Sequence, residues 1–85
     1  MTVAARVVAA LARAADVPVE SLARDARLAT LGIGSLEQIE CILALEDELQ
    51  LELGEPDLRS LRTVQDVIDA VERAVADAGR AAPKR

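Results

Sequence analysis

Three segments of the chain carry apolar residues at the spacing of an α-helix, and this periodicity restricts the fold more than any other feature. The segments cover residues 3–15, 35–50 and 64–78. In the first and third, the repeating residues are Val3, Val7, Leu11 and Ala14, and then Val64, Val67, Ile68, Val71 and Val75. The pattern predicts three main helices and no sheet.

Residues able to cap a helix stand at the start of each segment. Thr2 and Thr63 are placed to cap the first and third helices. Ser35 and Gln38 match a capping box at the start of the second. Gly79 is expected to end the third helix, which gives one folded domain over residues 1–78 and a flexible C-terminal tail over 79–85.

The connections complete the expected architecture. Residues 17–34 form an unusually long one, which Pro18 separates from the first helix. Its apolar residues suggest that it is pinned to the core, with a short turn near residues 20–24. Residues 57–61 are expected to form one short helix. The fold class is therefore all-α, a small four-helix bundle of three main helices and one short helix.

Composition narrows the possible functions. The chain has 85 residues, with no aromatic residue, no His and a single Cys. A core this small leaves little room for a water-excluding active site, and the commonest general base is missing. Cys41 has no partner for a disulfide or a zinc site, and its spacing suggests a small buried apolar residue. We expect no catalytic residue, no metal, no membrane span and a cytoplasmic monomer.

Charge points to the kind of partner. The formal net charge is −5, from 15 acidic and 10 basic residues, which disfavours nucleic acid and favours partners with basic surfaces. Residues 28–58 contain acidic residues but no Lys or Arg. On a helix at 100° per residue, an arc of roughly 100° holds the acidic residues Glu37, Glu40, Asp47 and Glu48. This stripe is either a solvated face or a docking surface, and its one-sidedness favours docking.

The rest of the second helix is largely apolar. Its residues are Leu36, Ile39, Ile42, Leu43, Leu45 and Leu49. An arc this wide predicts a helix with a broad buried side.

Three segments in order carry a resemblance to a known family. Leu31-Gly32-Ile33-Gly34-Ser35-Leu36 is similar to a signature in which leucine and glycine are followed by any residue, aspartate, serine and leucine, and this signature is typical of the acyl carrier protein family. Residues 37–49 resemble the family's second helix, including the closing acidic triplet, and residues 63–69 resemble the start of its last helix. The resemblance covers roughly residues 3–76 and is of the stand-alone fatty-acid or polyketide type. One position departs from it, because Gly34 stands where the family has aspartate.

The resemblance implies a carrier. A pantetheinyl transferase would attach 4′-phosphopantetheine from coenzyme A to Ser35, and acyl groups would be carried on that arm. The second helix would dock acyl-transferring, ketosynthase-type or adenylating enzymes through basic surfaces. The docking residues are then expected to be Leu36, Glu37, Glu40, Leu43, Asp47 and Glu48.

Two other interpretations stay open from the sequence. The chain is alternatively a carrier of amino acids or peptides, loaded by an adenylating enzyme. It is otherwise an unmodified helical interaction module of the same fold, an idea that Gly34 supports.

Overall fold

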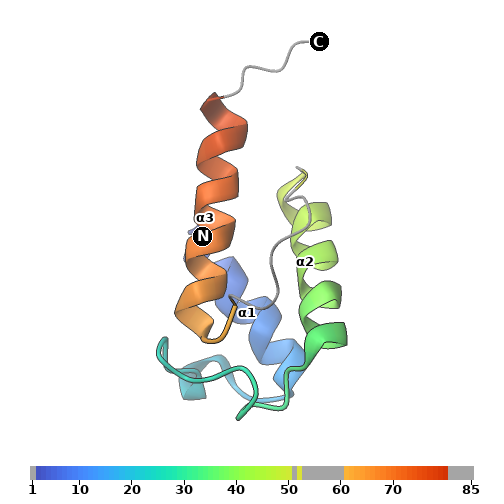
Figure 1. Ribbon diagram of the computed structural model, residues 1–85, viewed down its shortest axis with the longest axis vertical. Coiled ribbons are helices and arrows are strands. Elements are labelled where there is room, and N and C mark those ends of the chain that lie inside the picture. The colour runs from blue at the N-terminus through green and yellow to red at the C-terminus, as the bar shows by residue number, and fades with distance from the viewer. Residues whose placement is uncertain (1, 51, 53–60, 81–85) are drawn as a thin grey trace.

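The computed structural model describes residues 2–50, 52 and 61–80 and is helical. It contains α1 (Val3–Ala15), the 3₁₀ helix η1 (Val19–Ser21), α2 (Ser35–Leu49) and α3 (Val64–Arg80) (Figure 1). The predicted all-α bundle and its three main helices are confirmed, and η1 lies at the turn expected near residues 20–24. The short helix expected at 57–61 lies outside the described residues.

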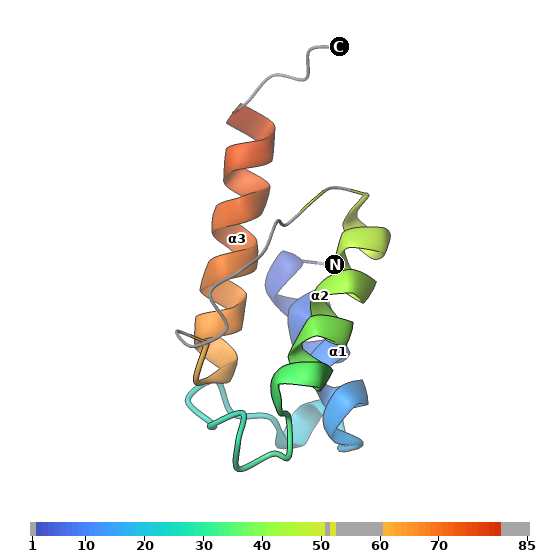
Figure 2. The ribbon, with the colours of Figure 1, turned by 45° about the vertical axis from the view of Figure 1, so that its right-hand side comes forward.

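Helix α1 contacts both other main helices and runs in the opposite direction to them (Figures 1 and 2). Its buried face consists mainly of small residues, with Ala4, Ala10 and Ala12 beside Val7 and Leu11. Small side chains let neighbouring helices approach closely, so α1 can pack against two helices at once. This arrangement brings the end of α1 and the starts of α2 and α3 to the same end of the molecule.

Helix α1 begins and ends with capping interactions. The Thr2 hydroxyl accepts a hydrogen bond from the Ala5 N–H at 3.0 Å, which confirms the predicted cap. At the other end, Asp16 adopts a left-handed conformation with φ of 60°, and the Val17 N–H bonds to the Ala12 carbonyl at 3.0 Å. This closing motif ends the helix two residues earlier than the restriction before Pro18 would require.

Helix α3 begins with a reciprocal capping box. The Thr63 hydroxyl accepts from the Asp66 N–H at 3.1 Å, as predicted. The Asp66 carboxylate accepts in return from the N–H groups of Thr63, at 3.1 Å, and of Arg62, at 2.9 Å. The expected stop at Gly79 is wrong, because the helix continues through that residue to Arg80. Glycine is a weak helix former, but its backbone can adopt helical dihedrals.

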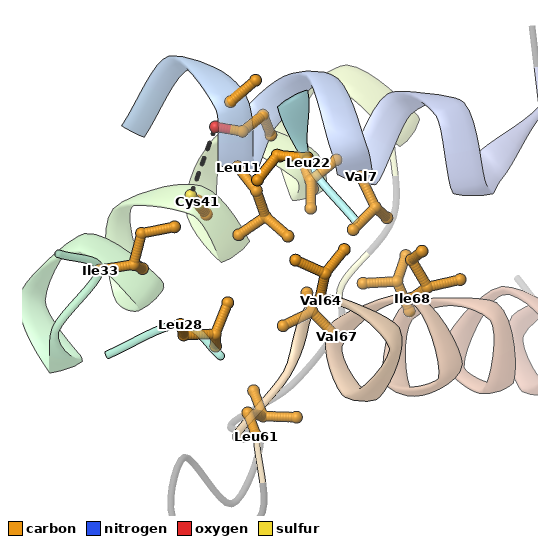
Figure 3. Packing of buried hydrophobic residues seen from close by; sticks show 14 of the residues in the cluster. Val7, Leu11, Leu22, Leu28, Ile33, Cys41, Leu61, Val64, Val67 and Ile68 are labelled. Carbon is orange, nitrogen blue, oxygen red and sulfur yellow. Dashed lines mark hydrogen bonds between the residues drawn. The ribbon is translucent and has the colours of Figure 1, made fainter. Parts of the chain in front are cut away.

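The core joins all three helices to the long connection between α1 and α2 (Figure 3). Leu22, Leu28 and Ile33 of that connection are buried among side chains of α1, α2 and α3. The prediction that the connection is pinned to the core is therefore confirmed. Val19 is an exception, with 48% of its surface exposed.

Two leucines of α2 test how much stability depends on core packing. Leu45 is fully buried, whereas Leu43 is 58% exposed. We expect Leu45→Ala to lower the free energy of unfolding by about 2–5 kcal/mol, because it leaves a cavity. The control Leu43→Ala should change it by no more than about 0.5 kcal/mol. Urea unfolding followed by circular dichroism measures both, and equal losses would contradict the packing described here.

The capping box of α3 predicts a pH dependence. Hydrogen bonds from the Arg62 and Thr63 N–H groups hold the pKa of the Asp66 carboxyl below its ordinary value of 3.8. A lowered folded-state pKa stabilises the fold above pH 3.8, and this contribution disappears as the pH falls through the folded-state pKa. We expect Asp66→Asn to lose less stability than the parent between pH 5 and the acid limit. Parallel urea titrations at each pH test this, and identical pH profiles would contradict it.

Candidate functional site

A glycine-closed turn leads the long connection toward α2. The Gly32 N–H bonds to the Ala29 carbonyl at 3.1 Å, and the Ile33 N–H bonds to the Leu28 carbonyl at 2.9 Å. Gly32 has φ of +79°, a left-handed conformation that glycine adopts without strain. The pattern is a Schellman motif, in which the two flanking apolar residues typically touch. Leu28 and Ile33 hold these positions, and both are buried.

The same connection is bonded to the start of α3. The Leu28 N–H donates to the Arg62 carbonyl at 2.9 Å, and the Val64 N–H donates to the Ala26 carbonyl at 3.0 Å. An isolated antiparallel bridge joins Arg27 to Thr63 at this point. These bonds satisfy free N–H groups near the start of α3, and they fix the connection that precedes Ser35.

Ser35 is the first residue of α2, and it is exposed. The capping position before it belongs to Gly34, whose N–H donates to Oε1 of Glu37 at 2.9 Å. The predicted capping box of Ser35 and Gln38 is therefore wrong by one residue. Oε1 of Gln38 is buried and has no hydrogen-bond partner among the described residues. Because Ser35 is not the capping residue, its hydroxyl is not needed to hold the helix end.

The surroundings of Ser35 fit a phosphate ester. The first N–H groups of a helix have no partner within the helix, and the helix dipole makes this end positive. Both effects favour an anion such as a phosphate attached to the first residue. Gly34 adds no side chain that would cover the serine. The site provides an exposed hydroxyl and anion-binding backbone groups, with no general base from histidine anywhere in the chain.

Helix α2 exposes apolar residues that the width of its apolar arc predicted to be buried, and two of them, Leu36 and Leu43, are also the apolar residues expected to dock partners. The exposed fractions are 64% for Leu36, 44% for Ile39 and 58% for Leu43. The expectation of a broad buried side is therefore wrong. The core takes only the strip that contains Cys41, Ile42 and Leu45, with Leu49 partly buried. Periodicity missed this division because α2 has apolar residues on two faces.

The predicted docking residues lie on two neighbouring faces of α2. Glu40 and Asp47 are exposed and lie on the same face as Leu36 and Leu43, within roughly 60° of arc. We call these four residues, together with Ile39, the exposed face of α2. Glu37 and Glu48 lie on the neighbouring face, rotated roughly 100° about the helix axis from Leu36.

Both flanking acids are engaged within the chain. Glu37 binds the Gly34 N–H, as described above. The Glu48 carboxylate forms an ion pair with the Arg6 guanidinium of α1 at 2.9 Å. An exposed pair of this kind contributes at most about 1 kcal/mol, so it leaves Glu48 accessible to other cations.

Cys41 is buried, as the sequence suggested. Its thiol lies 3.6 Å from the carbonyl oxygen of Ala10 (Figure 3). Burial raises the pKa of the Cys41 thiol, and the nearby Glu40 carboxylate raises it further. A buried thiol with a raised pKa is a poor nucleophile, so Cys41 is not suited to carry a reactive group.

The described residues offer neither a metal site nor a membrane span. No group of three or more His, Cys, Asp or Glu is placed to hold a metal ion in this part of the chain. None of the described helices is long and apolar enough to cross a membrane.

Comparison with known proteins identifies the family of the chain. A family model described as "Phosphopantetheine attachment site" matches residues 5–71. The chain is 36% identical over 70 residues to acyl carrier protein 3 of Ralstonia nicotianae, covering 81% of this chain and 80% of that protein. It is 40% identical over 60 residues to an acyl carrier protein of Thermosynechococcus vestitus, covering 71% and 68%. It is also 35% identical over 65 residues to chloroplastic acyl carrier protein 4 of Arabidopsis thaliana, and this match covers 76% of this chain and 45% of that protein.

The fold and the matched region define a small helical carrier domain of the phosphopantetheine-attachment class. Within that class, the chain belongs to the acyl carrier protein family. The prosthetic group of this class is a covalently attached 4′-phosphopantetheine.

Proposed function

We propose that Ser35 carries the 4′-phosphopantetheine arm and that the chain presents acyl groups on it to enzymes of fatty-acid or polyketide synthesis. The observation that carries the proposal is the exposed serine at the first residue of α2, inside the matched region. When bound, the arm supplies the thiol that holds the acyl group. The protein itself then needs no catalytic residue.

Attachment uses the Ser35 hydroxyl as the nucleophile. Its oxygen forms a bond to the phosphorus of the arm, the pyrophosphate bond of coenzyme A breaks, and the adenosine bisphosphate leaves with the electron pair. The serine proton passes to a base of the pantetheinyl transferase. Residues of this chain contribute accessibility and the positive end of α2, which stabilises the resulting phosphate diester.

The exposed face of α2 is the proposed docking surface. It combines three apolar side chains with the carboxylates of Glu40 and Asp47, directly after Ser35. A partner with an apolar depression bordered by Lys or Arg would complement it. Glu37 and Glu48 extend the negative charge on one side. This proposal places the transferase and the acyl-handling enzymes on one surface, used in turn.

Charge and composition support the remaining parts of the proposal. A net charge of −5 keeps the carrier away from nucleic acid and favours basic partners. The buried free cysteine is compatible with a reducing compartment, and we place the protein in the cytoplasm as a monomer.

The attachment proposal is tested by intact mass. The parent is incubated with coenzyme A, magnesium and a broad-specificity pantetheinyl transferase, beside Ser35→Ala. We expect the parent to gain one phosphopantetheine and the variant to gain none, with equal helical content by circular dichroism. Attachment at another residue would overturn the assignment of Ser35. An unmodified parent, with this transferase and a cognate one, would favour the interaction module without an arm.

The docking proposal is tested by affinity for the same transferase. We expect the double reversal Glu40→Lys/Asp47→Lys to weaken binding by about tenfold at low salt, because each exposed ion pair contributes up to about 1 kcal/mol. The loss should shrink at high salt through screening. Asp69→Lys/Glu72→Lys is the matched control, since it reverses two acidic residues that are exposed on α3. Equal affinities for both variants at low salt would count against this docking surface.

A further inference from the structure

The backbone at Gly34 does not itself require glycine. Its dihedral angles are φ −89° and ψ −170°, which is extended backbone that other residues also adopt. An added side chain would therefore change the space beside Gly34 rather than its backbone conformation.

The space beside Gly34 is taken by the carboxylate of Glu37. Oε1 of Glu37 lies 2.9 Å from the Gly34 nitrogen and accepts its hydrogen bond. A Cβ atom built on Gly34 would lie 3.2 Å from this same oxygen, which is tighter than nine in ten real Cβ contacts, so the end of the Glu37 side chain would have to shift slightly. Glycine leaves the bond uncrowded, but the bond does not require glycine, because the Thr63 N–H makes the same bond to Asp66 at the start of α3.

Hydrogen bonds on both sides of Gly34 fix the backbone that leads into Ser35. The Gly34 N–H is held by Glu37, and the Gly34 carbonyl accepts from the Gln38 N–H at 2.9 Å. The preceding turn is fixed by the buried residues Leu28 and Ile33. Without the Glu37 bond, the junction between that turn and α2 would contain a glycine with a free N–H and no side chain to restrict it.

We propose that Glu37 is a positioning residue for the modification of Ser35: it fixes the Gly34 peptide and so holds the serine hydroxyl in one orientation for the transferase. The inference rests on the proposed attachment at Ser35. A nucleophile held in one orientation reacts faster than one that samples several.

The test compares initial rates of arm attachment at limiting carrier concentration. We expect Glu37→Ala to lower kcat/KM by about fivefold, the fold-change that corresponds to loss of a typical helix cap. Glu37→Gln retains an oxygen acceptor for the Gly34 N–H and should stay within about twofold of the parent. Glu72→Ala, at an exposed position of α3 outside the docking surface, is the control for loss of one negative charge and should also stay within about twofold.

A second variant tests the Gly34–Glu37 hydrogen bond from the other side. Gly34→Ala brings a methyl group against the Glu37 carboxylate and should also slow attachment. Because both changes act on one hydrogen bond, the double variant Gly34→Ala/Glu37→Ala should be no slower than Glu37→Ala alone. A separate readout is hydrogen exchange of the Gly34 amide, which should be faster in Glu37→Ala and unchanged in Glu72→Ala.

The possible results distinguish failure of the proposed function from failure of the positioning role. A parent that gains no arm contradicts the proposed function. A parent and Glu37→Ala modified at equal rates contradict only the positioning role, even if the variant unfolds at lower temperature. If Glu37→Gln is as slow as Glu37→Ala, the transferase reads the charge of Glu37, and positioning through Gly34 is overturned. Additive slowing in the double variant would likewise overturn the pairing of Gly34 with Glu37.

Discussion

The rest of the structure depends on the burial of the long connection between α1 and α2. Leu22, Leu28 and Ile33 reach the core from a segment without a long helix, and the Leu28–Ile33 turn closes through a left-handed Gly32. Backbone hydrogen bonds join this segment to the start of α3. Since the connection is fixed at both places, the junction at Gly34 and the start of α2 are fixed as well. An exposed residue can thus have a defined position at the end of a long loop.

The apolar residues of α2 lie on two faces, one packed in the core and one exposed. One strip, with Cys41, Ile42 and Leu45, is buried, whereas Leu36, Ile39 and Leu43 are exposed. Exposed apolar side chains grouped on one helix face mark interaction surfaces in small proteins. In the proposed docking surface they are interleaved with carboxylates, which would favour basic partners. Among the described main helices, α2 is the one with large exposed apolar side chains, and it is the helix that begins at the proposed attachment site.

Much of this was predictable from local sequence. Helical periodicity located α1 and α3, because each has a single apolar face, and Thr2 and Thr63 marked their first turns correctly. The same reasoning failed at α2, where apolar residues on two faces give no unique buried side. It also assigned the capping box to Ser35 and Gln38. Glycine at the capping position leaves no side-chain signal there, and the acceptor comes from Glu37.

The sequence by itself determined the helical class and the acidic character, because these follow from residue type and short-range spacing, and its resemblance to a known family pointed to the candidate serine. Tertiary structure alone decided which side of α2 is buried, since only contact with α1 and the connection selects between two apolar faces. It also decided that Ser35 is free of a capping role. Gly34 is the capping residue because the Leu28–Ile33 turn places it at the start of α2. The position of that turn is set by long-range packing rather than by local preference.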